Sequence, residues 1–279
     1  MRIRHRYGFS SFNKHLLRFL SKNKIPYQSN GLTITVEVFE DDEQFDVIEL
    51  FMRENDAVDV ISAIYEQTEL DNSKWLSLKS EWWSQYPEPQ NNAGYLFATY
   101  DITEFCKGTD DGHYYCGKGL RQAHPFVIAR KPNWGARNFM MLNWVSDELF
   151  VSQKSFKILK DSGLTGFSFW NVMNKQQIPY DNVKQIYVET QLPKGVCQQS
   201  IAQVFVCPNC GFEKYITKPG PIRFKKELFY DLKCDIVRTT DKFGEIGCDS
   251  MILVSKEFYR VVINNKLGRG LIFEPIELI

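Results

Sequence analysis

The segment VFVCPNCGFEKY, residues 204–215, contains two cysteines that are separated by two residues and followed directly by a glycine. This spacing places Cys207 and Cys210 in one tight turn, where both thiolates can face the same metal ion. Gly211 suits the end of such a turn, because glycine has no Cβ to clash in a left-handed conformation. A structural zinc ion takes four ligands, so the motif predicts two further ligands elsewhere in the chain.

Cys116-Gly117, in the segment YDITEFCKGTDDGHYYCGKGL (residues 100–120), is the end of a second motif of this kind. Its upstream partner is either His113, which has the two-residue spacing, or Cys106, which lies farther away across a polar segment. Either residue completes the ligand set. The sequence therefore predicts one structural Zn²⁺ ion held by two turns. A redox dithiol is disfavoured, because the motif does not stand at the start of a helix after a strand.

Three further cysteines show no such pairing and are interpreted as small apolar residues: Cys197, Cys234 and Cys248. An odd total of seven cysteines at these spacings favours metal ligands over a disulfide framework.

The C-terminal part of the chain resembles itself. Residues 149–172, LFVSQKSFKILKDSGLTGFSFWNV, align with residues 252–276, ILVSKEFYRVVINNKLGRGLIFEPI, so that Val151-Ser152 matches Val254-Ser255. Each copy predicts a strand, a serine that caps a short amphipathic helix, a glycine-containing turn and a second strand. A cysteine-glycine pair precedes each copy, so the repeat includes the metal-binding turns.

The first hundred residues predict a separate module. Residues 31–40 alternate apolar and polar side chains and predict a strand, as do residues 94–102. Helical spacing predicts helices over residues 8–24 and from Asn55 to about Gln67. The fold class is thus α+β, with an N-terminal α+β module (1–100) and a zinc-binding domain (101–279). That domain contains two diverged units of a zinc knuckle plus a β-α-β element, at about 106–180 and 200–279, which share one structural zinc ion.

Composition narrows the classes of function. Lys plus Arg and Asp plus Glu number 34 each, so no bulk charge attracts nucleic acid or an anionic membrane. No apolar run reaches the roughly 20 residues that cross a bilayer, and the basic N-terminus lacks the apolar core of a secretory signal, so a cytoplasmic location is expected. With four histidines and no recognised catalytic motif, the sequence predicts no enzyme.

Several motifs occur in a recognisable order along residues 68–279. They are TYD (99–101), CGKGLRQ (116–122), KPNWG (131–135), LNWVSDELFVS (142–152), CPNCGFEKY (207–215), TDKFG (240–244), ILVS (252–255) and RGLIFEPI (269–276). This set resembles the bacterial double-CxxCG motif proteins, some of which are classed as immunity proteins against polymorphic toxins. When the two are aligned through TYD, Cys106 takes the place of the family's first cysteine and residues 109–115 are an insertion. The resemblance therefore implies Cys106, Cys116, Cys207 and Cys210 as the ligands.

The resemblance also implies a binding protein, so we expect an immunity protein that neutralises a cognate toxin. Its contact surface is expected in the acidic region 40–46 or in the aromatic region 75–86, because aromatic side chains commonly anchor interfaces. The alternative is a zinc-ribbon protein that binds nucleic acid through the basic segment RQAHPFVIARKPNWGAR, residues 121–137.

Overall fold

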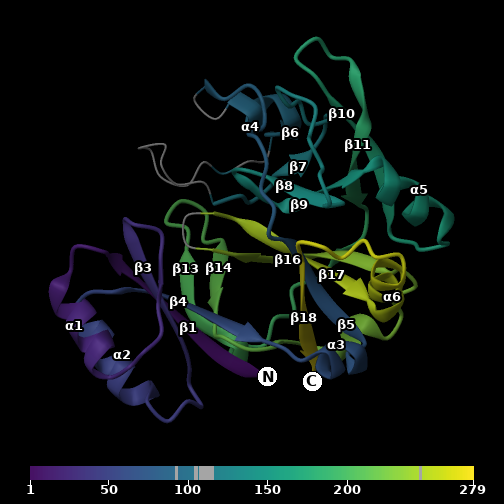
Figure 1. Ribbon diagram of the computed structural model, residues 1–279. Helices are drawn as coiled ribbons and strands as arrows, with labels where there is room; N and C mark the ends of the chain where they lie inside the picture. The colour runs from purple at the N-terminus through teal and green to yellow at the C-terminus, as the bar shows by residue number, and fades with distance from the viewer. Residues whose placement is uncertain (92–93, 104–105, 107–115, 245–246) are drawn as a thin grey trace. The chain divides into compact units, whose positions relative to one another are not determined.

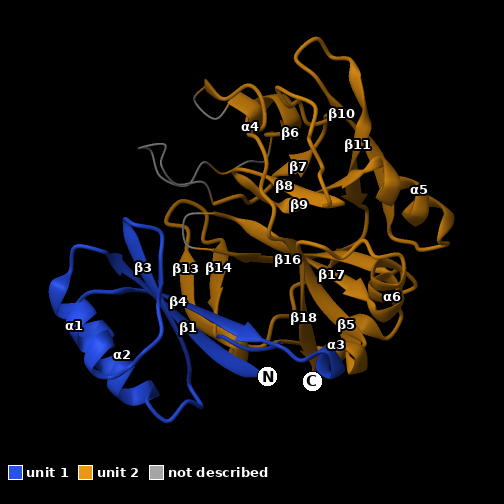
Figure 2. Cartoon of the chain, viewed as in Figure 1, with its two compact units in different colours: residues 1–69, 219–221 blue, residues 70–218, 222–279 orange. Residues whose placement is uncertain are grey.

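The computed structural model describes residues 1–91, 94–103, 106, 116–244 and 247–279. These residues form two compact units, one of residues 1–69 with 219–221 and one of residues 70–218 with 222–279 (Figure 2). Helices and strands alternate irregularly along the chain, which confirms the α+β class. No described helix combines the length and the hydropathy needed to cross a membrane.

The first unit is a four-stranded antiparallel sheet with two helices (Figure 1). Its elements are β1 (Arg2–Ser10), α1 (Lys14–Lys22), β2 (Gln28–Ser29), β3 (Thr33–Phe39), α2 (Phe45–Glu54) and β4 (Val58–Ile64). The strands lie in the order β2-β3-β1-β4. Alternate residues of β1 and β3 pack against the apolar faces of both helices, so this unit has a hydrophobic core of its own.

Two helix predictions in this unit differ from the structure. Strand β1 extends to Ser10, and helix α1 begins only after Asn13, whose Oδ1 accepts a hydrogen bond of 3.1 Å from the N–H of Leu16. The predicted helix from Asn55 to about Gln67 is wrong, because Val58–Ile64 pair along β1 as strand β4. This segment, VDVISAI, fits both helical and strand periodicity, and its β-branched residues suit the pleated sheet. The strand predicted at 31–40 is confirmed as β3.

The second unit contains a four-stranded sheet, an eight-stranded sheet and a two-stranded pair. Helix α3 (Gln67–Asn72) spans the boundary between the two units in sequence. The elements of the second unit up to residue 192 are β5 (Trp75–Ser80), α4 (Gly94–Thr99), β6 (Tyr100–Asp101), β7 (Arg121–Gln122), β8 (Phe139–Leu142), β9 (Val145–Ser152), α5 (Gln153–Asp161), β10 (Phe167–Met173), β11 (Pro179–Val188) and β12 (Gln191–Leu192). They are followed by β13 (Ile201–Val206), β14 (Glu213–Thr217), β15 (Ile222–Phe224), β16 (Ile236–Phe243), β17 (Asp249–Ser255), α6 (Lys256–Asn264) and β18 (Leu271–Leu278).

Residues 70–100 belong to this second unit, so the division of the chain differs from the predicted boundary at residue 100. The reason is strand β5, which lies between β17 and β18 and pairs antiparallel with both. Residues 94–102 were predicted as a strand, but Gly94–Thr99 form helix α4 and only Tyr100–Asp101 form a strand. The buried side chains of α4 contribute to a core cluster, and this packing outweighs their strand propensity.

The two copies of the repeat fold alike. In the first, the strands lie in the order β10-β11-β9-β8, and in the second the matching order is β18-β5-β17-β16. Each copy is therefore a hairpin, a helix and a returning strand, with one antiparallel strand inserted between the two parallel strands of the β-α-β unit. In the first copy the inserted strand is β11, which follows its β-α-β element in sequence. In the second copy the inserted strand is β5, which lies far before its β-α-β element in sequence. The predicted β-α-β elements are thus confirmed, with this addition.

One hydrophobic core holds both copies together. Aligned residues of the two copies, such as Leu159 and Val262, lie in the same cluster of apolar side chains. The other aligned apolar positions also belong to it: Phe156, Ile158, Leu164, Phe167 and Phe169 in the first copy, and Tyr259, Val261, Leu267, Leu271 and Phe273 in the second.

The helix caps show the same duplication. Ser152 Oγ accepts a hydrogen bond from the N–H of Ser155, and Ser255 Oγ accepts one from the N–H of Phe258. Each serine also donates its hydroxyl to the residue before the hairpin, to Asn138 Oδ1 at 3.2 Å in the first copy and to Asp235 Oδ1 at 2.7 Å in the second. The predicted serine caps are therefore confirmed, and each cap also fixes its helix to the start of its hairpin.

Replacing Ser255 with alanine is expected to lower the free energy of unfolding by about 1–2 kcal/mol, because one hydroxyl both caps α6 and binds Asp235. Denaturant unfolding at neutral pH measures this change. Ser255→Thr is the control, since threonine keeps the hydroxyl and should retain most of the stability. Equal stability of the alanine and threonine variants would show that the cap contributes nothing.

Candidate metal centre

The motif that contains Cys207 and Cys210 forms a tight turn between β13 and β14. The N–H of Cys207 donates to the carbonyl of Phe212, and the N–H of Gly211 donates to the carbonyl of Cys207, both at 2.9 Å. Gly211 has φ +67°, the left-handed conformation predicted from its place behind Cys210. Because the β13–β14 hairpin fixes both ends of this turn, Cys207 and Cys210 face the same side.

Cys106 lies close to the described segment 116–120, which is called the first cysteine loop below. The N–H of Cys106 donates to the carbonyl of Lys118 at 3.2 Å, and Cys116 Sγ donates to the carbonyl of Cys106 at 3.5 Å. Cys106 is thus held against the first cysteine loop, despite the distance between the two cysteines in sequence. His113, the alternative partner, lies outside the described residues.

The four sulfur atoms of the two loops converge, all lying within 4.8 Å of one another. Cys106 Sγ lies 3.8 Å from Cys207 Sγ, and Cys116 Sγ lies 3.6 Å from Cys210 Sγ. A disulfide needs about 2.05 Å, so all four cysteines are free thiols. Four thiolates about 2.3 Å from a tetrahedral ion stand about 3.8 Å apart, so the observed spacing fits a four-coordinate metal ion.

The electrostatics of the cluster differ between its members. Burial opposes ionisation of Cys207, but the N–H groups of Asn209 and Cys210 outweigh it and lower the pKa of this thiol to about 7. Burial raises the pKa of Cys116 and of Cys210. Buried thiols of this kind lose their protons readily only beside a cation, so metal binding here would be coupled to proton release.

Cys248, interpreted from the sequence as a simple apolar residue, supports the first loop. Its Sγ donates a hydrogen bond to the carbonyl of Cys116 at 2.7 Å. It also packs against Gly117, where a Cβ would lie 2.2 Å from Cys248 Sγ. Gly117 is therefore required twice, by this contact and by its φ of +72°. The sequence held no signal for the role of Cys248, because residue 248 is distant from both motifs.

Replacing Gly117 with alanine is expected to displace the first loop and weaken metal retention, because the added methyl overlaps the Cys248 side chain. Gly211→Ala is the matched control, since that glycine also has a positive φ but has no atom within 4 Å of a Cβ. The control should cost only about 1–2 kcal/mol of left-handed strain. Metal retention against a chelator measures both variants, and equal losses would contradict the steric role of Gly117.

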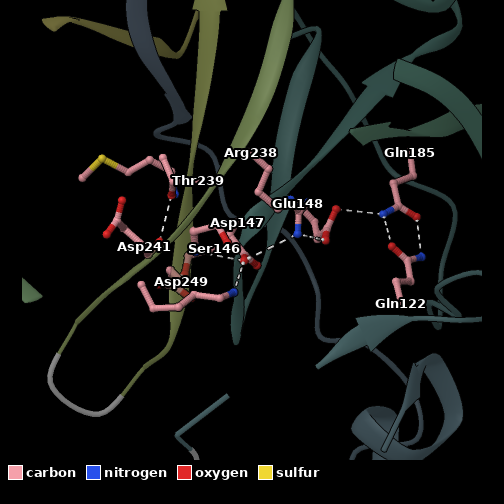
Figure 3. Close-up of polar contacts among 12 residues, drawn as sticks. Gln122, Ser146, Asp147, Glu148, Gln185, Arg238, Thr239, Asp241 and Asp249 are labelled. Carbon is pink, nitrogen blue, oxygen red and sulfur yellow. Dashed lines mark hydrogen bonds and ion pairs between the residues drawn. The ribbon is translucent and has the colours of Figure 1, made fainter. Parts of the chain in front are cut away.

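A buried polar network, which no motif in the sequence indicates, joins β7, β9, β11 and β16 (Figure 3). Arg238 Nη1 on β16 lies 2.7 Å from Glu148 Oε1 on β9, and Gln185 Nε2 on β11 donates to Glu148 Oε2 at 2.9 Å. Gln185 and Gln122 exchange hydrogen bonds between their side-chain amides, at 2.6 and 2.8 Å. Gln122 belongs to β7, directly after the first cysteine loop, so the network connects this loop to both sheets.

The carboxylates of this network are held in different ways. Burial raises the pKa of Glu148, which is only 1% exposed, although Arg238 opposes this rise. Asp147 Oδ2 accepts a hydrogen bond of 3.1 Å from the N–H of Ser250 and lies 3.8 Å from Lys242 Nζ. Burial and the charge of Asp147 raise the pKa of Asp249 to about 6, and Ser146 Oγ donates to that carboxyl.

Comparison with models of known protein families finds no match to this chain. A search of curated protein sequences likewise finds no match.

Proposed function

We propose that this protein is a zinc-stabilised protein-binding module, an immunity protein that binds and neutralises a cognate bacterial toxin in the cytoplasm. Zinc is the favoured ion, because four thiolates at tetrahedral spacing suit it best among the common metals. A set of four protein ligands leaves no coordination position for water or substrate. The ion would therefore stabilise the fold and take no part in a reaction.

The observation that carries the binding role is an exposed aromatic pair, Tyr86 and Trp144. Their rings lie 4.5 Å apart between centroids, and their exposed fractions are 39% and 53%. Trp82 of the aromatic region packs edge-on against Trp134, so the available part of region 75–86 is its C-terminal end. Large exposed aromatic side chains held in fixed positions are typical anchors of protein interfaces.

The backbone holds this pair at a cost in strain. Gln85 and Trp144 both have left-handed conformations, with φ of +64° and +68°. Hydrogen bonds from the backbone N–H and the side-chain amide of Asn143 to the carbonyl of Gln85, both 2.8 Å, join the two segments. A residue with a Cβ that adopts the left-handed backbone conformation lowers the stability of the fold by about 1–2 kcal/mol. Backbone strain of this kind is concentrated at functional sites.

The acidic region 40–46 is a weaker candidate for the contact. Asp41 and Asp42 already form ion pairs with Arg2, at 2.8 and 2.9 Å, so much of their charge is neutralised within the protein. The aromatic pair is therefore the surface at which we place the toxin.

A binding experiment with the product of the neighbouring gene tests this proposal. Co-purification should yield a stable complex, and Trp144→Ala should weaken it about 30-fold, as expected for an aromatic anchor worth about 2 kcal/mol. Tyr230→Ala, which removes an aromatic ring 67% exposed elsewhere, is the control and should leave the affinity unchanged. Absence of any complex, or equal effects of the two variants, would refute the proposed contact.

The alternative, a nucleic-acid-binding zinc ribbon, finds less support. In the basic segment 121–137, Lys131 Nζ lies 2.6 Å from Asp181 and the guanidinium of Arg137 lies 5.4 Å from the centroid of the Trp82 ring. Two of the cations of this segment are therefore paired within the protein. An affinity for single-stranded DNA that falls steeply with salt concentration would favour the alternative.

A further inference from the structure

A cavity of about 350 Å³ lies between the first cysteine loop and β16 in the second unit. Lys118 and Arg121 line it from the loop side, and Arg238 and Lys242 line it from the strand. Among the described residues around it, Asp101 is the one carboxylate. The lining itself thus has four cations against one carboxylate. Behind it, Glu148 and Asp147 pair with Arg238, and Asp147 also lies near Lys242, so the excess positive charge comes mainly from Lys118 and Arg121.

Hydroxyl groups complete this lining. Thr103, Thr240 and Ser250 border the same cavity. A combination of guanidinium, ammonium and hydroxyl donors is the set that binds the oxygens of phosphate groups, because all three can donate hydrogen bonds to an oxyanion.

Two buried polar atoms of the lining residues have no hydrogen-bond partner within the described part of the chain. They are Arg238 Nε and Ser250 Oγ. Glu148 binds Arg238 through Nη1, which leaves the Nε edge of the guanidinium for another acceptor. A buried polar atom without a hydrogen-bond partner costs about 1–3 kcal/mol, so two of them in residues that line one cavity favour a bound partner there.

The buried network fixes the orientation of the arginine. Glu148 Oε1 at 2.7 Å and Asp147 Oδ2 at 3.6 Å both lie beside Nη1. Figure 3 shows Arg238 extending toward Glu148 and Asp147. Lys242 Nζ lies 3.8 Å from Asp147, too far for a hydrogen bond, so its donors are not used in that contact.

We propose that this cavity binds a phosphate group, either as the free ion or as the head of a small phosphate monoester. Arg238 and Ser250 would bind it from the side of β16 and β17, and Lys118 and Arg121 from the side of the first cysteine loop. The volume exceeds that of a single water-sized ligand about tenfold, which leaves room for a substituent on the phosphate. This site does not depend on the proposed toxin-binding role, because neither Tyr86 nor Trp144 lines the cavity.

Isothermal titration calorimetry with inorganic phosphate tests the site. The protein is loaded with metal, and chloride keeps the ionic strength constant. Saturable binding of one phosphate per chain is expected. Arg121→Gln should weaken it at least tenfold, whereas Lys157→Gln, which removes an exposed cation on α5, should leave it unchanged. Metal content measured for every variant separates loss of the phosphate site from loss of the metal centre.

Ser250→Ala gives a second, independent readout. Removing an unpartnered buried hydroxyl should leave the melting temperature in chloride unchanged or raise it, while phosphate affinity falls severalfold. Glycerol phosphate as a second ligand distinguishes the sources: tighter binding than inorganic phosphate assigns the site to a monoester, and equal binding assigns it to the free ion. Unsaturable phosphate binding, or equal affinity in the Arg121→Gln variant, would overturn the proposal. So would a short single-stranded DNA that binds tightly where phosphate does not.

Discussion

Replacing Cys210 with serine is expected to abolish metal retention and to destabilise the second unit by several kcal/mol. The free energy of structural zinc binding, about 10–16 kcal/mol in small zinc domains, contributes directly to folding stability. Cys210 Sγ lies 3.6 Å from Cys116 Sγ, and the cluster among the described residues consists of four sulfur atoms, so the serine variant keeps only three. Metal analysis of the purified protein, followed by thermal unfolding, measures both effects.

Cys197→Ser is the matched control for this prediction. It makes the same chemical change in a half-buried cysteine outside the cluster and should retain one zinc ion per chain. The first unit should remain folded in the Cys210→Ser variant, because its core contains none of the cysteines. A Cys210→Ser protein that keeps the wild-type metal content would contradict a four-cysteine site.

The same assay decides the fourth ligand. Cys106→Ser should release the ion as Cys210→Ser does, since the structure places Cys106 Sγ within the cluster. His113→Ala should retain it. The reverse result would assign the fourth position to the histidine.

Replacing Arg238 with methionine is the second change with a large expected effect, about 3–5 kcal/mol lost from the free energy of unfolding. The cause is Glu148, which is 1% exposed and would be left as an uncompensated buried charge. The double variant Arg238→Met with Glu148→Leu should recover most of the loss, because it removes both charges together. Urea unfolding of the single and double variants at pH 7 measures the coupling.

The pH dependence of the free energy of unfolding of Arg238→Met tests whether the buried charge of Glu148 causes the loss of stability. Burial already raises the pKa of Glu148 above its value in the unfolded chain, and loss of Arg238 should raise it further. The folded state then binds the proton more tightly than the unfolded state. The variant should therefore be least destabilised at low pH and lose stability as pH rises through the raised pKa.

A surface ion pair serves as the control. Lys131 and Asp181 lie 2.6 Å apart but are 54% and 80% exposed, so Lys131→Met should cost less than about 1 kcal/mol. Similar losses for Arg238→Met and Lys131→Met would show that the Glu148 charge is not isolated from solvent.

Local sequence determined the features that depend on a few neighbouring residues. The turn at Cys207–Gly211 follows from its spacing and its glycine, and the caps of α5 and α6 follow from single serines. The internal repeat was also readable, because matching apolar positions in two helices pack into one core. Each of these signals lies within a short window in which chain geometry limits the outcome.

Only the tertiary structure decided the features that join distant segments. Strand β5 completes the sheet of the second copy of the repeat by pairing with both β17 and β18. Residues 58–64 form strand β4 because they pair with β1. The contact of Cys248 with Gly117 and the ion pair of Arg238 with Glu148 likewise join residues that have no pattern between them in sequence. A strand or a buried charge is stabilised by the partner group that lies next to it in the fold. When that partner is distant in sequence, the spacing of residues does not identify it.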